Sequence, residues 1–205
     1  EKYINESDAS PMAVLTEKAN QQHYEVPAEF YRYALGKNYK YSCCYYDSKN
    51  DSLDQAEDLA LALTCEHANL ENGLDILELG CGWGSLSLWM AKHFPKSKIT
   101  SISNSNSQRE YIMGQAGRRG LENLTVHTED INEFETGSQF DRVVSVEMFE
   151  HVRNHRELFS RINSWLKPGG KLFTHVFCHR STSYPFEVEG EDDWMSKHVF
   201  SGGTM

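Results

Sequence analysis

Apolar and amphipathic runs alternate along most of this sequence, from about residue 74 onward. Each apolar run has the usual length of a β-strand, and each amphipathic run is long enough for a helix. The predicted strands cover residues 74–79, 98–103, 124–130, 140–147 and 171–177, and the predicted helices cover 86–94, 106–119 and 155–166. The strands are nearly continuous apolar runs, which is typical of a parallel sheet covered on both faces. The alternation therefore predicts a doubly wound, mostly parallel α/β fold.

A further helix is predicted ahead of the first strand, over residues 52–71. Ser52 and Gln55 have the spacing of a capping box at its start. Asn72 and Gly73 are suited to end it. Its expected apolar face consists of Leu53, Ala56, Ala60, Leu63, His67 and Leu70.

The first fifty residues show neither the strand-like nor the helix-like pattern over any long stretch, and they are rich in aromatic side chains. A short helix is predicted between Pro27 and Gly36, residue types that suit the two ends of a helix. We therefore divide the chain into an N-terminal lid segment at the entrance of the site, residues 1–50, and a main domain, residues 51–205.

Composition and charge narrow the class of protein. The 205 residues are 39% hydrophobic and 24% charged, as in a globular protein of one domain. The net charge of −10 argues against a nucleic-acid partner, because phosphate binding depends on clustered Lys and Arg. No apolar run has the length of a membrane-spanning helix, and the first residues lack the apolar core of a signal peptide. Five scattered cysteines without a CxxC pair predict reduced thiols, a cytoplasmic location and no metal site.

The stretch ILELGCGWGS, residues 76–85, joins the strand at 74–79 to a helix. Its glycines, among them Gly80 and Gly82, permit positive φ and a close ligand approach at the carboxyl end of the strand. Their GxGxG spacing differs from the GxGxxG of dinucleotide sites. Glu78 sets a carboxylate near the turn, which disfavours phosphates and favours a cationic ligand. A tight turn that binds nothing is the alternative.

ILELGCGWGS and WLKPGGKLF (165–173) resemble motifs of class I S-adenosylmethionine-dependent methyltransferases. The segments HYEVPAEFYRYALGKNYKYSCCYY, ITSISNSNSQ and SVEMFEHV are similar to those shared by cyclopropane fatty-acid synthases and coclaurine-type N-methyltransferases. FCHRSTSYPFE, EDDW and FSGGTM are closer to the N-methyltransferases. The resemblance implies an enzyme that uses S-adenosylmethionine. It also implies a seven-stranded Rossmann-like sheet whose last strands lie beyond Met205.

The resemblance also assigns contacts to the cofactor. It places Tyr41 and Ser42 at the methionine end, Gly80 and Gly82 beneath the cofactor, Ser103, Asn104 and Gln108 around the ribose, and Asp130 and Ile131 at the adenine. Glu78 is added to these cofactor residues because its carboxylate favours a cationic group such as a sulfonium. The strand at 98–103 lacks the terminal acid that most class I methyltransferases use for the ribose. Amide side chains can still hydrogen-bond a diol, although helix capping and a solvated face are alternatives for Asn104 and Gln108.

The chemistry is predicted at SVEMFEHV, residues 145–152, where a strand leaves the sheet. An amine must lose its proton before it accepts a methyl group, and a carboxylate or imidazole can take that proton. In the N-methyltransferase branch E-x-x-E-H lies at the amine. We therefore expect Glu150 and His151 as an acid–base pair and Glu147 as the residue that holds the cationic substrate. A solvated loop is the alternative.

Aromatic rings near this strand end could attract the same cation. The candidates are Phe149, Tyr184, Phe186 and Trp194. Packing in the core is the more common role of any one such ring.

The rival hypothesis is cyclopropanation of an unsaturated membrane lipid. The synthases hold a bicarbonate base at positions that match Cys43, Glu150 and His175, and all three residue types occur here. The synthases commonly have a small residue where this chain has Glu147, and a carboxylate is poorly accommodated beside an aliphatic chain. We therefore favour a small amine as the substrate. A non-catalytic scaffold is the third hypothesis.

Overall fold

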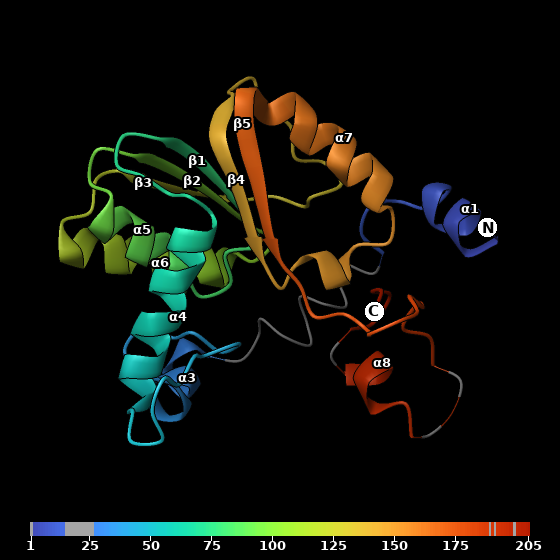
Figure 1. Ribbon diagram of the computed structural model, residues 1–205, viewed down its shortest axis with the longest axis horizontal. Coiled ribbons are helices and arrows are strands. Elements are labelled where there is room, and N and C mark those ends of the chain that lie inside the picture. Colours follow the sequence, from blue (N-terminus) through green and yellow to red (C-terminus); the bar gives the residue numbers. More distant parts are fainter. Residues whose placement is uncertain (1, 15–26, 189, 191, 199) are drawn as a thin grey trace.

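A parallel β-sheet forms the centre of the molecule (Figure 1). The computed structural model describes residues 2–14, 27–188, 190, 192–198 and 200–205. Among these residues the sheet has five strands in the order β3-β2-β1-β4-β5. They are β1 (Asp75–Leu79), β2 (Lys98–Ser103), β3 (Leu124–Thr128), β4 (Phe140–Val146) and β5 (Leu166–His175), and every neighbouring pair is parallel. The predicted strands and their parallel arrangement are confirmed.

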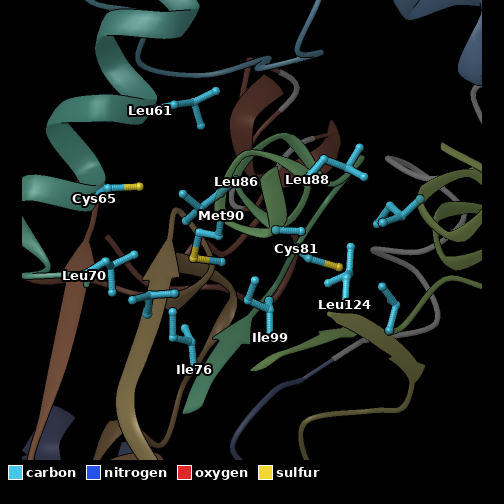
Figure 2. Packing of buried hydrophobic residues seen from close by; sticks show 14 of the residues in the cluster. Leu61, Cys65, Leu70, Ile76, Cys81, Leu86, Leu88, Met90, Ile99 and Leu124 are labelled. Atoms are coloured by element: carbon cyan, nitrogen blue, oxygen red, sulfur yellow. The ribbon is translucent and has the colours of Figure 1, made fainter. Parts of the chain in front are cut away.

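Helices cover both faces of the sheet, as a doubly wound fold requires. On one face α4 (Leu53–His67), α5 (Ser85–His93) and α6 (Asn106–Arg119) enclose a core that includes Ile76 and Ile99 (Figure 2). On the other face α7 (His155–Trp165) packs against a second core that includes Leu77 and Ile102. The alternation of Ile76 and Leu77 between the two cores follows from the period-2 geometry of a strand.

Side-chain caps mark the starts of α4, α6 and α7, and the capping box predicted for α4 is confirmed. Ser52 and Gln55 form the capping box of α4. The side chain of Asn154 accepts a hydrogen bond from the N–H of Glu157 and begins α7. α6 begins after Ser105 and ends at Gly120, which has φ 65. Its bounds match the predicted helix because both ends carry local signals.

The structure departs from the predicted elements at several ends. α4 stops at His67, although a helix to residue 71 was expected, and β5 begins at Leu166, five residues before the predicted start. The expected inward face of α4 is also partly wrong, because His67 is exposed and Leu63 is only half-buried. Glu57 is buried instead, beneath a loop that the periodicity of the helix could not reveal.

Short helices complete the two ends of the described chain. The predicted helix after Pro27 is α3 (Ala28–Ala34). Two others, α1 (Lys2–Asp8) and α8 (Trp194–His198), were not predicted. α1 packs against α7 (Figure 1). Ala13 forms an antiparallel bridge with Val152. Residues far apart in the sequence therefore meet at the end of β4. In the described part of the chain no helix has the length and hydropathy needed to span a membrane.

Candidate active site

A cavity of about 490 Å³ lies at the carboxyl ends of the strands. The residues that directly follow four of the strands line it: Gly80 after β1, Asn104 after β2, Glu129 after β3 and Glu147 after β4. This edge is where ligands bind in open α/β sheets. The volume is within the usual range for a small-molecule site.

Two glycines shape the floor of this cavity after β1. Gly80 and Gly82 have φ values of 77 and 51, in the left-handed region. A β-carbon at Gly82 would lie 2.9 Å from Oη of Tyr41, and one at Gly80 would lie 2.6 Å from Cγ of Met148. Larger residues would therefore be strained and would also collide with the cavity wall. The predicted contacts Tyr41 and Ser42 line the same part of the cavity.

Polar side chains after β2 form the next part of the wall. The hydroxyl of Ser103 donates to Oε1 of Gln108 at 2.6 Å, and both residues line the cavity with Asn104. Nε2 of Gln108 is buried without a hydrogen-bond partner among the described residues. It is thus a donor that a bound hydroxyl group could satisfy.

The segment after β3 closes this side of the cavity. The predicted residues Asp130 and Ile131 line it, together with Glu129. Oδ1 of Asp130 accepts the backbone N–H of Asn132 at 2.8 Å. One carboxylate oxygen of Asp130 therefore shapes the loop. Glu129, which directly precedes Asp130 in the sequence, is a lining residue that was not predicted.

Glu78 does not line the main cavity. It borders a smaller cavity of about 40 Å³ beneath the glycine turn. Its carboxylate accepts hydrogen bonds from the hydroxyls of Ser87 and Ser101, the latter at 2.7 Å. Burial raises the pKa of Glu78, against the opposing effect of these two hydroxyls. The structure thus places Glu78 beneath the glycine turn and outside the main cavity, so its predicted contact with the cofactor stays a prediction.

The three acid–base candidates at the end of β4 separate into two groups. Glu147 and His151 line the cavity, but Glu150 does not. Glu150 is 3% exposed, and its Oε1 accepts the backbone N–H of Phe177. Burial raises the pKa of Glu150, against the opposing effect of that hydrogen bond. The carboxylate of Glu150 therefore holds the chain after β5 in place beside the cavity.

Cys43, Glu147 and His175 form a cluster beside the cavity. Their Sγ, carboxylate and ring nitrogen atoms all lie within 4.8 Å of one another. The thiol of Cys43 donates to Oε1 of Glu147. Partial burial of the thiol, and then this carboxylate, raise the pKa of Cys43 to about 11. The cluster contains two of the three residues that the rival hypothesis assigned to bicarbonate, but Glu147 stands where Glu150 was expected.

The predicted aromatic wall is only partly present. Phe149 and Phe186 are buried, and Phe149 belongs to the core against α7. Trp194, 61% exposed, lines the cavity, and so does Phe200. Tyr184 is exposed but does not line it.

Comparison with known proteins identifies the family. Residues 14–205 match the mycolic acid cyclopropane synthetase family. The chain belongs to this family. It is 39% identical over 194 residues to an (S)-coclaurine N-methyltransferase of Thalictrum flavum subsp. glaucum. The aligned residues make up 95% of this chain and 54% of that protein. A cyclopropane-fatty-acyl-phospholipid synthase of Escherichia coli strain K12 is 30% identical over 90% of this chain and 46% of its own length.

A solved structure agrees with this assignment. The crystal structure of coclaurine N-methyltransferase bound to N-methylheliamine and SAH matches all of this chain and 59% of its own, at a TM-score of 0.92 and 37% identity. The chain thus spans about half the length of the curated relatives it matches. The resemblance noted from the sequence motifs is confirmed, both for the cyclopropane synthetase family and for its N-methyltransferase relatives.

Several cavity residues of this cyclopropane synthetase family member carry no local sequence signal. Ala13, Val14, His198 and Ser201 line the cavity from the two ends of the described chain. Asn132 holds the first of these segments, because its amide accepts the N–H of Ala13 and donates to the oxygen of Ala13, each at 3.0 Å. Such contacts depend on the folded topology.

Residues 23–26 of the motif that begins HYEVPAEF lie outside the described residues.

Proposed function

We propose that the protein is an S-adenosylmethionine-dependent N-methyltransferase of a small, alkaloid-like amine. The observation that carries the proposal is Glu147, which presents a carboxylate to the cavity at the end of β4. Its backbone N–H donates to the oxygen of His175 at 2.8 Å, so its position is fixed from the neighbouring strand. A carboxylate in a partly enclosed cavity attracts a protonated amine.

The cavity suits the cofactor that this proposal requires. S-adenosylmethionine supplies a methyl group on a sulfonium. Gly80 and Gly82 would lie beneath it, Ser103, Asn104 and Gln108 would bind its ribose, and Asp130 and Ile131 would contact its adenine. The unpartnered Nε2 of Gln108 supports this assignment, because a ribose hydroxyl could accept its hydrogen bond.

Glu147 and His151 are the groups that can act on the amine. Both line the cavity, and either can take the proton that an amine must lose before it reacts. Glu150 does not line the cavity, and its carboxylate fixes the chain after β5 by accepting the N–H of Phe177. We therefore revise the expected acid–base pair to Glu147 and His151, with Glu150 as a positioning residue.

Lipid cyclopropanation is the competing candidate, supported by the proximity of Cys43 and His175. Two features disfavour it. The carboxylate of Glu147 in the same cluster would repel a bicarbonate anion. The side chain of Glu150, which the rival hypothesis requires at the anion, is directed to Phe177. The relatives named as N-methyltransferases are also more similar to this chain than the named synthase.

The partners and the location follow from the same features. With a net charge of −10 we expect no nucleic-acid partner. The five free cysteines support a reducing compartment, and we propose the cytoplasm.

The proposal is tested by incubating the protein with methyl-labelled S-adenosylmethionine and either a panel of secondary and tertiary amines or unsaturated phospholipid vesicles. We expect label in amines. Label in lipid alone would establish the rival reaction. Calorimetric titration with S-adenosylhomocysteine tests both enzyme hypotheses against the non-catalytic scaffold, because the absence of any binding would count against both reactions.

A further inference from the structure

The cluster of Cys43, Glu147 and His175 has the composition of a metal site. We propose that these three side chains bind a thiophilic divalent cation, with Zn²⁺ as the best match. The donors come from three segments: Cys43 from the loop before α4, Glu147 from the end of β4 and His175 from the end of β5. The proposal concerns a ligand other than the amine and the methyl donor, so it goes beyond the proposed function.

The geometry of the donors is close to what zinc requires. Zinc binds thiolate sulfur at about 2.3 Å, and imidazole nitrogen and carboxylate oxygen at about 2.0–2.2 Å. In a tetrahedral site, such donors therefore lie roughly 3.3–3.7 Å from one another. The three donor atoms here already lie within 4.8 Å of one another. Side-chain rotations that move the donor atoms by about an ångström would bring them to these separations, and the strands would not need to move.

The backbone holds two of the three ligand residues together. The N–H of Glu147 donates to the oxygen of His175 at 2.8 Å. Cys43 and Glu147 both have left-handed backbones, with φ of 50 and 53, and these conformations accompany the meeting of their side chains. Three protein ligands leave a fourth position open to water, as in zinc sites that are not purely structural.

The choice of cation follows from the donors. A thiolate and an imidazole together favour zinc and its neighbours over Mg²⁺ or Ca²⁺, which prefer oxygen ligands. On binding, the S–H bond of Cys43 breaks, its proton passes to solvent and a sulfur–metal bond forms. The carboxylate of Glu147, which accepts the hydrogen bond of that thiol in the metal-free protein, then binds the metal instead of the thiol proton. No oxidation or reduction takes place.

Sequence spacing gave no sign of this site, because its ligands are separated by 104 residues between Cys43 and Glu147. The expectation that the chain has no metal site rested on the absence of a CxxC pair. Ligands that converge from a loop and two strand ends are invisible to such a test.

The site is tested by titrating the reduced full chain with Co²⁺ as a spectroscopic probe for Zn²⁺. We expect a thiolate-to-cobalt charge-transfer band that Zn²⁺ abolishes. Cys43→Ser should remove the band and weaken Zn²⁺ binding on the order of 100-fold. Losing a residue that only supports a metal ligand already costs up to about 100-fold in affinity, and losing a ligand should cost at least as much. His175→Gln should weaken binding of the metal while retaining the thiolate.

Matched controls distinguish this cluster from a nonspecific thiol. Cys44→Ser changes the neighbouring residue, whose thiol is directed to the oxygen of Lys40 at 3.4 Å, and Cys178→Ser removes an exposed thiol elsewhere. Both variants should keep the band and the affinity of the unaltered protein. A band that survives Cys43→Ser, or that disappears with either control, overturns the proposal. Circular dichroism of each variant confirms that the fold is retained, and His175→Gln serves as the test should Cys43→Ser fail to fold.

The metal site and the proposed methyl transfer can fail separately. The cobalt titration uses neither amine nor methyl donor, so an inactive enzyme leaves its result intact. If the metal site and the methyl transfer are both correct, Zn²⁺ should inhibit methylation competitively with the amine, because Zn²⁺ and the amine both bind Glu147. Inhibition by Zn²⁺ that is equal in Cys43→Ser and in the unaltered protein would show that the cluster is not the site.

Discussion

At the scale of single residues, Glu147 makes two hydrogen bonds and also lines the cavity. Its N–H bonds to His175, its carboxylate accepts the thiol of Cys43, and the same side chain borders the cavity. Only four non-glycine residues among those described have positive φ, and Glu147 and Cys43 are two of them. The local backbone is thus arranged so that these two side chains meet.

We expect Glu147→Gln to lower kcat for amine methylation by about 100-fold, because an amide can neither take a proton nor hold an ammonium by charge. The substitution preserves shape and hydrogen-bonding reach. Affinity for S-adenosylhomocysteine should be unchanged. Steady-state kinetics and calorimetric titration measure the two quantities.

The matched control is Glu133→Gln, an exposed carboxylate near the cavity but not on its wall. Its kinetics should equal those of the unaltered protein. Equal loss in the two variants, or none in Glu147→Gln, would remove Glu147 from the mechanism.

Three buried carboxyls make stability depend on pH. Burial raises the pKa of Glu57, Glu78 and Glu150. A carboxyl whose pKa is raised in the folded state binds more protons there than in the unfolded chain. Its contribution to stability is therefore full below the ordinary value of about 4.5 and is lost as pH rises through the folded-state pKa. We expect Glu78→Gln to show a smaller fall in free energy of unfolding between pH 4.5 and 7 than the unaltered protein, measured by denaturant titration. Identical slopes would contradict this.

At the scale of elements, the strands and most of the long helices could be predicted because their signals are local. α6 has Ser105 at its start and Gly120 at its end, and its predicted bounds are those observed. α8 has five residues, too few for a periodic signal in the sequence. α4 shows the limit of periodicity, since Glu57 on its buried face binds a loop from earlier in the chain.

Glu57 fixes the loop that carries Tyr41 and Ser42 to the cavity. Its two oxygens accept the backbone N–H groups of Gly36, Asn38 and Lys40, at 2.9, 2.7 and 3.2 Å. On the same helix, Asp54 accepts the N–H of Lys37 at 2.7 Å. The acidic face of α4 therefore holds the loop through its backbone.

We expect Glu57→Ala to lower the free energy of unfolding by about 2 kcal/mol, because it leaves one buried and two partly buried N–H groups unsatisfied. It should also weaken binding of S-adenosylhomocysteine, although Glu57 does not line the cavity. Denaturant unfolding and calorimetry measure the two effects. Glu66→Ala removes an exposed carboxylate from the same helix and should change stability by no more than about 0.5 kcal/mol. Unchanged cofactor affinity in Glu57→Ala would show that the loop holds its position without this residue.

At the scale of the whole molecule, the short 3₁₀ helix η1 (Phe149–His151) joins distant parts of the chain. The oxygen of Glu150 accepts the N–H of Thr204 at 2.7 Å, and Arg153 donates to the oxygen of Gly202 at 3.2 Å. The N–H of Arg153 donates to the oxygen of Met12 at 2.6 Å. Strand ends and glycines could be placed at the cavity from the sequence. Trp194 was also a candidate from the sequence, but Ala13, Val14, His198 and Ser201 were not, because only the folded chain brings them to the cavity.

Gly203→Ala tests this junction, because a β-carbon at Gly203 would overlap the backbone oxygen of Glu150. Residues 200–201, which line the cavity, should be displaced, and kcat/KM for the amine should fall about tenfold or more. Affinity for S-adenosylhomocysteine should stay within about twofold if the displacement is confined to this wall. In Gly190→Ala the nearest atom to the new β-carbon is Oδ2 of Asp193 at 3.9 Å, an ordinary contact, and this variant should be unaffected. Equal kinetics in the two variants would contradict the junction.

The left-handed backbone of Glu147, with φ 53, also predicts a trade-off between thermal stability and activity. A side chain in that conformation costs roughly 1–2 kcal/mol, which glycine avoids at the expense of greater freedom in the unfolded chain. We expect Glu147→Gly to raise the melting temperature by about 1–3 °C while amine methylation is lost, whereas Glu147→Gln should show the loss without the gain. Scanning calorimetry of the two variants would measure the difference, and a lower melting temperature for Glu147→Gly would contradict it. Selection for heat resistance alone would then favour glycine at this position, and only selection for catalysis would retain the carboxylate.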